Sequence, residues 1–354
     1  ALDALAASHC LVQRTKPVPV AGIEAVLRGW PVSLAAFSSR RLHRYVRRTL
    51  DTRPIAAVFV FSGQMGHYVP RDFAGRLVVD LVDVDSAKFE AYAERTRGVR
   101  RWLFEREEQL LRAEEARLAR RADATLLVSV AEAALLLSRV SLDDSVRVWP
   151  LINGIDSIAY DPSRVASEPE LVGRPGPVLI FTGQMDYPPN IAAVLRAARR
   201  IMPLVRAQFP QAEFHVVGRR PTMEVRALDG VNGCRVHGAV PDVRPWLRGA
   251  DLALVPLEIA RGIQNKVLEA MAMELPVVAS IGAATGINAR PPGELAVGES
   301  DAELAGAVIG LLSDPARAKR IGQAARRCLV REHSWAAALQ PLAGMLGARG
   351  ADDA

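Results

Sequence analysis

Short apolar segments rich in β-branched residues alternate along the chain with longer segments in which apolar residues recur every three or four positions. The short segments predict buried strands, and the longer ones predict amphipathic helices. This alternation is typical of parallel sheets that carry helices on both faces. The predicted strands of the first half are 55–61, 76–82, 124–129 and 146–150, and those of the second half are 177–183, 212–218, 233–238, 251–256, 275–280 and 293–298.

A segment rich in proline, glycine and polar residues, 160–177, separates the two sets of strands and is typical of an interdomain linker. We therefore predict an α/β protein with two Rossmann-like, doubly wound domains at 1–165 and 166–335, followed by a terminal helix and tail at 336–354. Open α/β sheets bind ligands at the carboxyl ends of their strands, so the two domains are expected to face each other across a cleft. The second set of strands is complete for such a sheet, whereas the first is short by about two.

The chain carries a net charge of +6, and only four of its 45 basic residues are lysine. A basic surface favours partners that carry phosphate, namely nucleic acid, anionic lipid or an activated sugar. Nucleic acid is disfavoured because aromatic residues make up only 5% and no RRM, KH or zinc-finger pattern is present. No apolar run reaches the roughly 18 residues that span a bilayer, and the three cysteines lack metal-ligand spacing. We expect a cytoplasmic protein without a metal site.

The segment 261–280, RGIQNKVLEAMAMELPVVAS, predicts a polar loop, a short helix and a buried strand. The helix follows a predicted strand, so it begins where ligands bind in such sheets. Its unpaired N–H groups and positive dipole end suit a diphosphate, and Lys266 adds a full charge. Glu269 lies on the same helix face and can accept hydrogen bonds from two ribose hydroxyls. Taken alone, the residues favour a plain surface salt bridge between Lys266 and Glu269.

Several motifs, in the same order along the chain, resemble those of the retaining glycosyltransferases of the GT-B fold, glycosyltransferase family 4 (group 1). They are PLINGIDSIAYDP, FTGQMDYPPNIAAVL, FHVVGRRP, VHGAVPDVRPWLRGADLALVP, NKVLEAMAMELPVVAS and REHSWAAAL. VVDLVDVDSAKFEAYA, ARGIQNKVLEAMAM and the FTG opening are most similar to the sugar transferases associated with exosortase and PEP-CTERM exopolysaccharide systems. The resemblance implies a GT-B fold, with a carboxy-terminal domain that binds the nucleotide sugar.

In the donor site, the resemblance implies that Glu269 binds the ribose hydroxyls, and that the backbone N–H groups of Val267 and Leu268 bind the diphosphate. Gly183 would let the chain approach the phosphates, and the backbone around Val240 would meet the nucleotide base. The donor-binding residues that we predict are Gly183, Gln184, Asn190, Val240, Gly262, Asn265, Lys266, Val267, Leu268 and Glu269.

Two positions depart from the family pattern. Many members have a second Glu eight residues before the first, where this chain has Arg261. Many also carry a phosphate-binding Arg or Lys after the glycine of the first strand, where this chain has QMDYPPN. We expect Lys266 and Arg261 to supply the missing positive charge, which would stabilise the departing diphosphate.

In the first domain, Asp83 and Asp85 of the sequence DVD follow a predicted strand. GT-B enzymes generally work without a metal, so we predict that these carboxylates face the acceptor and orient or deprotonate its hydroxyl. Helix capping by Asp85 or Ser86 is an equal alternative. His67 lies where some relatives carry an active-site histidine, although a surface histidine fits the residues equally well. The predicted catalytic residues are His67, Asp83, Asp85, Arg261 and Lys266.

The resemblance implies a retaining glycosyltransferase that moves a sugar from a nucleotide diphosphate sugar to a hydroxyl of a lipid-linked glycan, in exopolysaccharide or cell-surface polysaccharide synthesis. No cofactor is expected, and contact with an anionic membrane would be peripheral, through the basic surface. The alternatives are a GT-B nucleotide-sugar 2-epimerase and a catalytically silent nucleotide-sugar-binding module. The sequence begins at ALDALAASHC, past the strand and Gly-rich loop that open the relatives, so the amino-terminal domain is expected to be incomplete.

Overall fold

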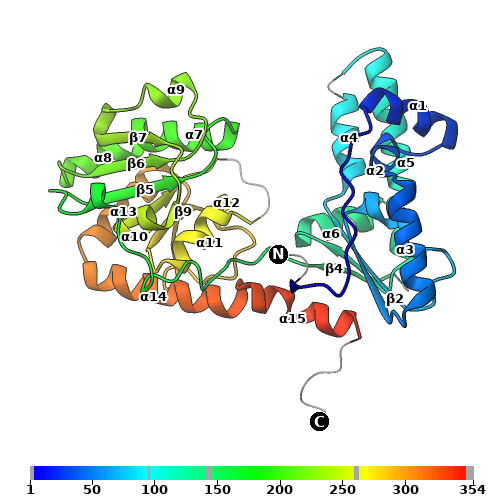
Figure 1. Ribbon diagram of the computed structural model, residues 1–354. Coiled ribbons are helices and arrows are strands. Elements are labelled where there is room, and N and C mark those ends of the chain that lie inside the picture. The colour runs from blue at the N-terminus through cyan, green and yellow to red at the C-terminus, as the bar shows by residue number, and fades with distance from the viewer. Residues whose placement is uncertain (1–3, 95, 140–145, 259–262, 348–354) are drawn as a thin grey trace, which may run out of the picture. The chain divides into compact units, whose positions relative to one another are not determined.

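The computed structural model describes residues 4–94, 96–139, 146–258 and 263–347 (Figure 1). The chain forms two compact units. The first unit comprises Ala1–Leu151 and Gln340–Ala354, and the second comprises Ile152–Leu339. None of the described helices is both long enough and apolar enough to cross a bilayer.

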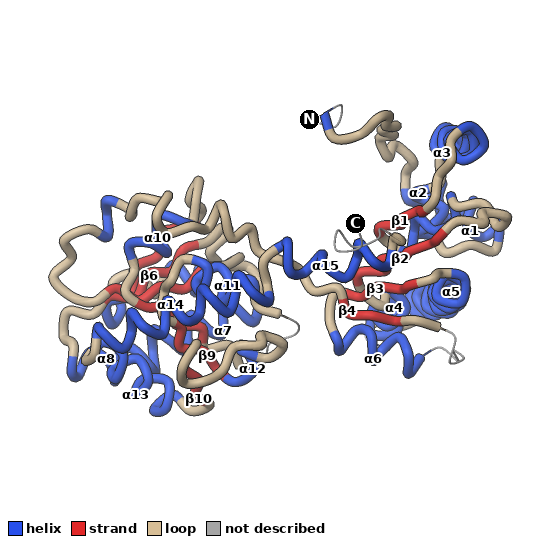
Figure 2. The backbone as a smooth tube through the Cα atoms, turned by 90° about the horizontal axis from the view of Figure 1, so that it is seen from below, coloured by secondary structure: helices blue, strands red, loops and turns tan. Residues whose placement is uncertain are grey.

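The first unit is built on a parallel sheet of four strands in the order β1-β2-β3-β4, which lie side by side in Figure 2. The strands are β1 (Ala57–Phe61), β2 (Arg76–Val82), β3 (Ala124–Leu127) and β4 (Val148–Pro150). Its helices are α1 (Val18–Arg28), α2 (Val32–Phe37), α3 (Arg40–Thr52), η2 (Gly63–Tyr68), α4 (Asp85–Glu94), α5 (Val99–Arg121) and α6 (Val130–Arg139).

The second unit is built on a parallel sheet of six strands in the order β10-β9-β8-β5-β6-β7. The strands are β5 (Val178–Thr182), β6 (Glu213–Val217), β7 (Cys234–Gly238), β8 (Leu252–Val255), β9 (Val277–Ser280) and β10 (Ala296–Gly298). Its helices are η3 (Pro169–Leu171), α7 (Pro188–Arg196), η4 (Ala197–Ile201), α8 (Met202–Gln208), α9 (Met223–Arg226), η5 (Val231–Gly233), α10 (Arg244–Gly249), α11 (Asn265–Ala272), α12 (Ile281–Ala284), α13 (Asp301–Leu312), α14 (Pro315–Glu332) and α15 (Trp335–Met345).

The strand order of the second unit is that of a doubly wound, Rossmann-like sheet, in which the direction of winding reverses between β5 and β8. All residues of β5, β8 and β9 are buried, because helices cover the sheet on both sides (Figure 2). Burial on both faces explains why these strands are continuous apolar runs in the sequence. Every strand predicted from the sequence is present, and the predicted α/β class with parallel sheets is confirmed.

The two units divide between Leu151 and Ile152, whereas the composition of the chain placed the division at residue 165. Segment 152–165 lies on the second unit because long-range hydrogen bonds hold it there. The Ile155 amide donates to the carbonyl of His333 at 2.8 Å, and the Arg326 guanidinium donates to the carbonyl of Tyr160 at 2.7 Å.

The second division falls between Leu339 and Gln340, inside α15, rather than at residue 335. The last turns of α15 pack on the sheet of the first unit. Leu342 and Met345 contact Val78 and Leu126 there, and the Arg76 guanidinium donates to the carbonyl of Gly344 at 3.2 Å. These contacts place the end of the helix in the first unit.

Candidate functional site

The predicted donor-site residues meet at a cavity of about 740 Å³ in the second unit. Its walls come from the turns that follow β5, β6 and β7 and from the start of α11. Strand β5 is one of the two strands between which the strand order reverses, so the cavity lies at the topological switch point, where such sheets bind ligands. The predicted residues that line it are Gly183, Gln184, Asn190, Val240, Asn265, Lys266 and Glu269.

Lys266 is a cation at the start of α11 that lines this cavity. Its ammonium Nζ donates to Oδ1 of Asn190 at 2.9 Å and lies 5.2 Å from the centre of the Phe181 ring. Burial lowers the pKa of Lys266 to about 8, and the nearby carboxylate of Glu269 partly opposes that shift. An ammonium has three hydrogen atoms to donate, so the bond to Asn190 leaves donors for an anion in the cavity.

Asn190 joins the two halves of the site. Its Nδ2 donates to the carbonyl of Gln184 at 2.9 Å, while its Oδ1 accepts from Lys266. The side chain therefore ties the turn after β5 to the first turn of α11. Asn190 is buried at the start of α7, where helix packing holds it in place.

Gly183 and Gly218 are glycines because two backbone segments touch at this turn. A Cβ on Gly183 would come within 2.9 Å of Nδ2 of Asn190, and a Cβ on Gly218 would come within 1.6 Å of the carbonyl oxygen of Gly183. The amide of Gly183 also donates to the carbonyl of Val217 at 3.1 Å. Side chains at either glycine would separate β5 from β6 at the cavity floor.

Glu269 lies one turn after Lys266 on α11 and lines the same cavity. Burial raises the pKa of the Glu269 carboxyl, while Lys266 and the phenol of Tyr160 favour its charged form. Burial also raises the pKa of Tyr160 to about 12, and Glu269 adds to this shift. The described residues form no ion pair between Lys266 and Glu269, because the ammonium is bonded to Asn190 instead. A plain surface salt bridge therefore does not describe this pair.

The start of α11 differs from the expected phosphate cradle in one respect. The amides of Val267 and Leu268 both donate to the carbonyl of Gln264, at 2.9 and 3.3 Å, and their side chains are buried in the core. These two amides are therefore engaged within the helix start. The first intrahelical bond lies after Asn265 and Lys266, so a ligand would meet the amides of these two residues. Arg261 and Gly262 lie outside the described residues.

The structure adds cavity residues that the sequence analysis missed. Arg219, after β6, lines the cavity and donates from Nη2 to Oε1 of Gln184 at 2.9 Å. Tyr187 and Ile263 also line it, and Tyr160 reaches Glu269 from the segment that precedes η3. Arg219 had a local signal, since it follows a predicted strand. The signal was weak because arginine is abundant throughout this chain.

In the first unit, His67 lies in η2 within a cluster of rings. Its ring centroid is 4.0 Å from that of Tyr68, 5.2 Å from His43 and 5.5 Å from Trp30. Its Nδ1 is 2.8 Å from the carbonyl oxygen of Gln64, and its Nε2 is buried with no partner among the described residues. Burial lowers the pKa of His67 to about 4. His67 is thus a half-buried, neutral histidine rather than a surface one.

Asp83 is exposed after β2, and Asp85, the first residue of α4, accepts from Nε2 of Gln64 at 2.6 Å. The amide and hydroxyl of Ser86 donate instead to the buried carboxyl of Glu115, at 2.9 and 2.6 Å. Glu115 of α5 therefore caps this helix, and Asp85 does not. Burial raises the pKa of Glu115 to about 7. The described residues contain no group of three or more His, Cys, Asp or Glu that could hold a metal ion.

These features define the fold of the protein. Two α/β units with parallel sheets, one of them a complete Rossmann-like sheet with a cavity at its switch point, form the GT-B glycosyltransferase fold. Residues 176–314, which carry the cavity, match the protein family described as glycosyl transferases group 1.

Among curated proteins, the chain is similar to alpha-maltose-1-phosphate synthase of Mycolicibacterium smegmatis, with 28% identity over 239 residues. It is 29% identical over 244 residues to the protein of the same name from Mycobacterium tuberculosis (strain ATCC 25618 / H37Rv). Each match covers 59% of this chain and 61% of the relative, so the chain spans less than two thirds of the length of these relatives.

Solved structures share the fold at low identity. The glycosyltransferase from Rickettsia africae ESF-5 superposes with a TM-score of 0.62 and 13% identity, covering 95% of this chain and 83% of that chain. Anabaena Alr3699/HepE in complex with UDP-glucose superposes with a TM-score of 0.58 and 15% identity, covering 87% of this chain and 82% of that chain. These likenesses establish the fold.

Proposed function

We propose that the protein is a group 1 glycosyltransferase that takes its sugar from a nucleoside diphosphate sugar. One observation carries the proposal: Lys266 and Glu269, on the first turns of α11, line one cavity together with the glycine turn after β5. An ammonium at a helix start suits a diphosphate, and a carboxylate one turn further suits vicinal ribose hydroxyls. The family match over this unit and the UDP-glucose complex of the HepE structure support the same ligand class.

The chemistry that we propose is transfer with retention of configuration, which the resemblance to the retaining GT-B enzymes supports. As the bond between the sugar and the diphosphate breaks, negative charge develops on the leaving phosphate. Lys266, the amides of Asn265 and Lys266, and Arg219 surround the cavity and would stabilise that charge. Preorganised positive charge of this kind is commonly the largest contribution to catalysis in such sites. Arg261, in the loop before α11, is proposed to add to it.

For the acceptor, we propose a hydroxyl of a lipid-linked glycan, in exopolysaccharide or cell-surface polysaccharide synthesis of the kind that exosortase-associated sugar transferases serve. Asp85 is the candidate that orients this hydroxyl, because Gln64 holds its carboxylate at 2.6 Å. His67 would act as a neutral hydrogen-bonding group, since its low pKa keeps the ring uncharged at pH 7.

Peripheral contact with the cytoplasmic face of an anionic membrane is also proposed, through the surface between α1 and α3. A groove of about 930 Å³ lies there, lined on the α1 side by Val20, Ile23 and Leu27. Ile23 and Leu27 are 65% and 82% exposed. Arg40 and Arg44 line the groove from α3. Exposed apolar side chains beside cations are typical of surfaces that bind anionic lipid headgroups.

The test of the transferase is incubation with a panel of nucleoside diphosphate sugars, with and without a hydroxyl acceptor. Acceptor-dependent release of the nucleoside diphosphate would support transfer. Conversion of the donor into an epimeric sugar nucleotide without any acceptor would favour the 2-epimerase. Binding without release or conversion would favour a silent binding module.

A further inference from the structure

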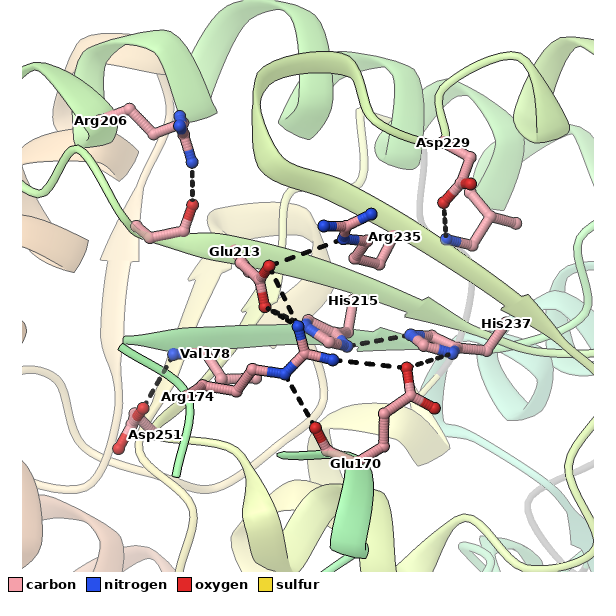
Figure 3. A network of polar contacts seen from close by, with 12 residues as sticks. Glu170, Arg174, Val178, Arg206, Glu213, His215, Asp229, Arg235, His237 and Asp251 are labelled. Carbon is pink, nitrogen blue, oxygen red and sulfur yellow. Dashed lines mark hydrogen bonds and ion pairs between the residues drawn. The ribbon is translucent and has the colours of Figure 1, made fainter. Parts of the chain in front are cut away.

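A network of polar side chains lies along β6 and β7 (Figure 3). His215 on β6 is fully buried, and its Nδ1 lies 2.9 Å from Nε2 of His237 on β7. The two rings are stacked, with centroids 5.0 Å apart and planes 11° from parallel. On its other side, Nε2 of His215 lies 3.2 Å from Oε2 of Glu213.

These contacts define where the protons lie. The carboxylate of Glu213 only accepts hydrogen bonds, so Nε2 of His215 carries a hydrogen. Nδ1 of the neutral His215 ring is then an acceptor, and Nε2 of His237 must donate to it. The third nitrogen contact, from Nδ1 of His237 to Oε1 of Glu170, is longer, at 3.6 Å. The chain from Glu213 to His237 therefore selects one tautomer and one ring orientation for each histidine.

Burial, more than the charged groups nearby, keeps the two rings neutral at pH 7. Burial lowers the pKa of both histidines, and Arg174 acts in the same direction on each. Arg235 adds to the lowering at His237, whereas the carboxylates oppose it, from Glu213 at His215 and from Glu170 and Asp229 at His237. Arg174 pairs with Glu213 at 3.1 Å, so this carboxylate is also satisfied.

His237 stands at the entrance of the loop that forms one wall of the donor cavity. Gly238 follows it, and Ala239, Val240 and Val243 line the cavity. At the far end of this loop, the ring centroid of Trp246 on α10 lies 4.2 Å from that of His237. The two rings thus close the base of loop 238–243.

The same loop is tied to the rest of the cavity. The amide of Gly218, in the turn after β6, donates to the carbonyl of Gly238 at 2.8 Å. Gly218 and Arg219 line the cavity beside the loop. A change in the position of His237 would therefore move the loop and its contact with the neighbouring turn together.

We propose that His237 is a positioning residue for the nucleotide base, holding loop 238–243 in the shape that lines the donor cavity. The inference rests on the proposed donor site, in which the backbone around Val240 meets the base. An apolar ring would also pack against Trp246, but it would leave the buried Nδ1 of His215 without a donor. The hydrogen bond from His237 thus adds a fixed orientation to the packing.

The experiment compares the wild type with His237→Phe and His237→Gln by calorimetric titration. The ligands are the nucleoside diphosphate that the wild type binds best and inorganic diphosphate, which has no base. His237→Phe should weaken the binding of the nucleoside diphosphate by about threefold to tenfold, which corresponds to one neutral hydrogen bond. The affinity for inorganic diphosphate should not change. His237→Gln, which keeps an N–H near the position of Nε2, should recover at least half of that loss.

Equal weakening of both ligands would make His237 a merely structural residue, and unchanged binding of both would also overturn the inference. If His237→Phe does not fold, Trp246→Phe, which reduces the ring contact with His237 from the α10 side, is compared with the wild type on the same two ligands. The wild-type titration separates the two proposals. A wild type that binds no nucleoside diphosphate overturns the donor site and this inference together, whereas a wild type that binds it leaves the variants to judge His237.

Discussion

Oδ1 of Asn190, at the start of α7, accepts a hydrogen bond from Nζ of Lys266, at the start of α11, at a distance of 2.9 Å. The two residues are far apart in the sequence, and the contact joins the turn after β5 to the helix that follows β8. The bond uses one ammonium hydrogen, so the others remain to be donated to an anion. Burial lowers the pKa of Lys266 to about 8, which leaves the group charged at pH 7. In the proposed donor site, this contact therefore links two segments that the motif alone does not connect.

Lys266→Met should lose affinity for a nucleoside diphosphate by about tenfold to a hundredfold, because a charge-assisted hydrogen bond contributes about 1.5–3 kcal/mol. Affinity for the nucleoside alone should change little. Calorimetric titration with nucleoside, monophosphate and diphosphate measures the difference. Lys319→Met, an exposed lysine on α14 of the same unit, is the matched control and should bind all three ligands as the wild type does.

The affinity for nucleoside diphosphate should fall as the pH rises through about 8. The pKa of Lys266 is lowered to about 8 in the folded protein, so the ammonium is charged below that pH and becomes neutral above it. Above about pH 8, binding must recharge the amine, which costs up to about tenfold in affinity per pH unit. Titrations at pH 7 and pH 9 measure this, and Lys266→Met should remove most of the dependence. A wild-type affinity that is equal at both values would contradict the assignment.

Glu269→Gln should weaken the binding of ribonucleotides by about tenfold while leaving the melting temperature of the protein nearly unchanged. The carboxylate can accept from two ribose hydroxyls, whereas the amide offers a single acceptor oxygen and a misplaced donor. The same variant should bind a 2′,3′-dideoxy nucleotide as weakly as the wild type binds it, because neither hydroxyl remains to be recognised. Glu224→Gln, on exposed α9, serves as control. Equal ribonucleotide affinity in wild type and Glu269→Gln would remove Glu269 from the donor site.

Gly183→Ala should destabilise the second unit by about 1–3 kcal/mol and reduce nucleotide affinity. The new methyl group would press on Nδ2 of Asn190, which cannot move without releasing Lys266. Gly306→Ala is the matched control, because Gly306 lies in α13 with open space around its Cα, and alanine there should stabilise by about 0.5–1 kcal/mol. Thermal unfolding and one titration for each variant decide the prediction. A fully stable, fully binding Gly183→Ala would show that the turn has room to adapt.

The protein should sediment with vesicles that contain anionic phosphatidylglycerol and remain in solution with vesicles of phosphatidylcholine alone. Ile23→Asp combined with Leu27→Asp should abolish the sedimentation, because both side chains lie exposed in the groove between α1 and α3. Added salt should weaken binding by screening Arg40 and Arg44. Met223→Asp places the same change on an exposed apolar residue of the second unit and should have no effect. If the double variant still sediments, another surface is responsible.

The strands and the α/β class could be predicted from the sequence, because the apolar pattern of each strand lies within its own segment. Segment 251–256 is a continuous apolar run, which is what burial between two layers of helices demands. Likewise Lys266 and Glu269 stand three residues apart on one helix, so the helical repeat alone places them on one face. The placement of these two residues at one cavity was therefore predictable from spacing.

Tertiary structure decided what joins these pieces. The division at Leu151 follows from hydrogen bonds that Ile155 and Tyr160 make to α14 and its end, and no local composition encodes them. The ammonium of Lys266 is bonded to Asn190, and not to Glu269 as helix spacing also allowed. His237 contacts His215 because β6 pairs with β7, and its contact with Trp246 depends on where α10 packs. Spacing along a helix or strand is set by local geometry, whereas contacts between elements depend on how the whole chain packs.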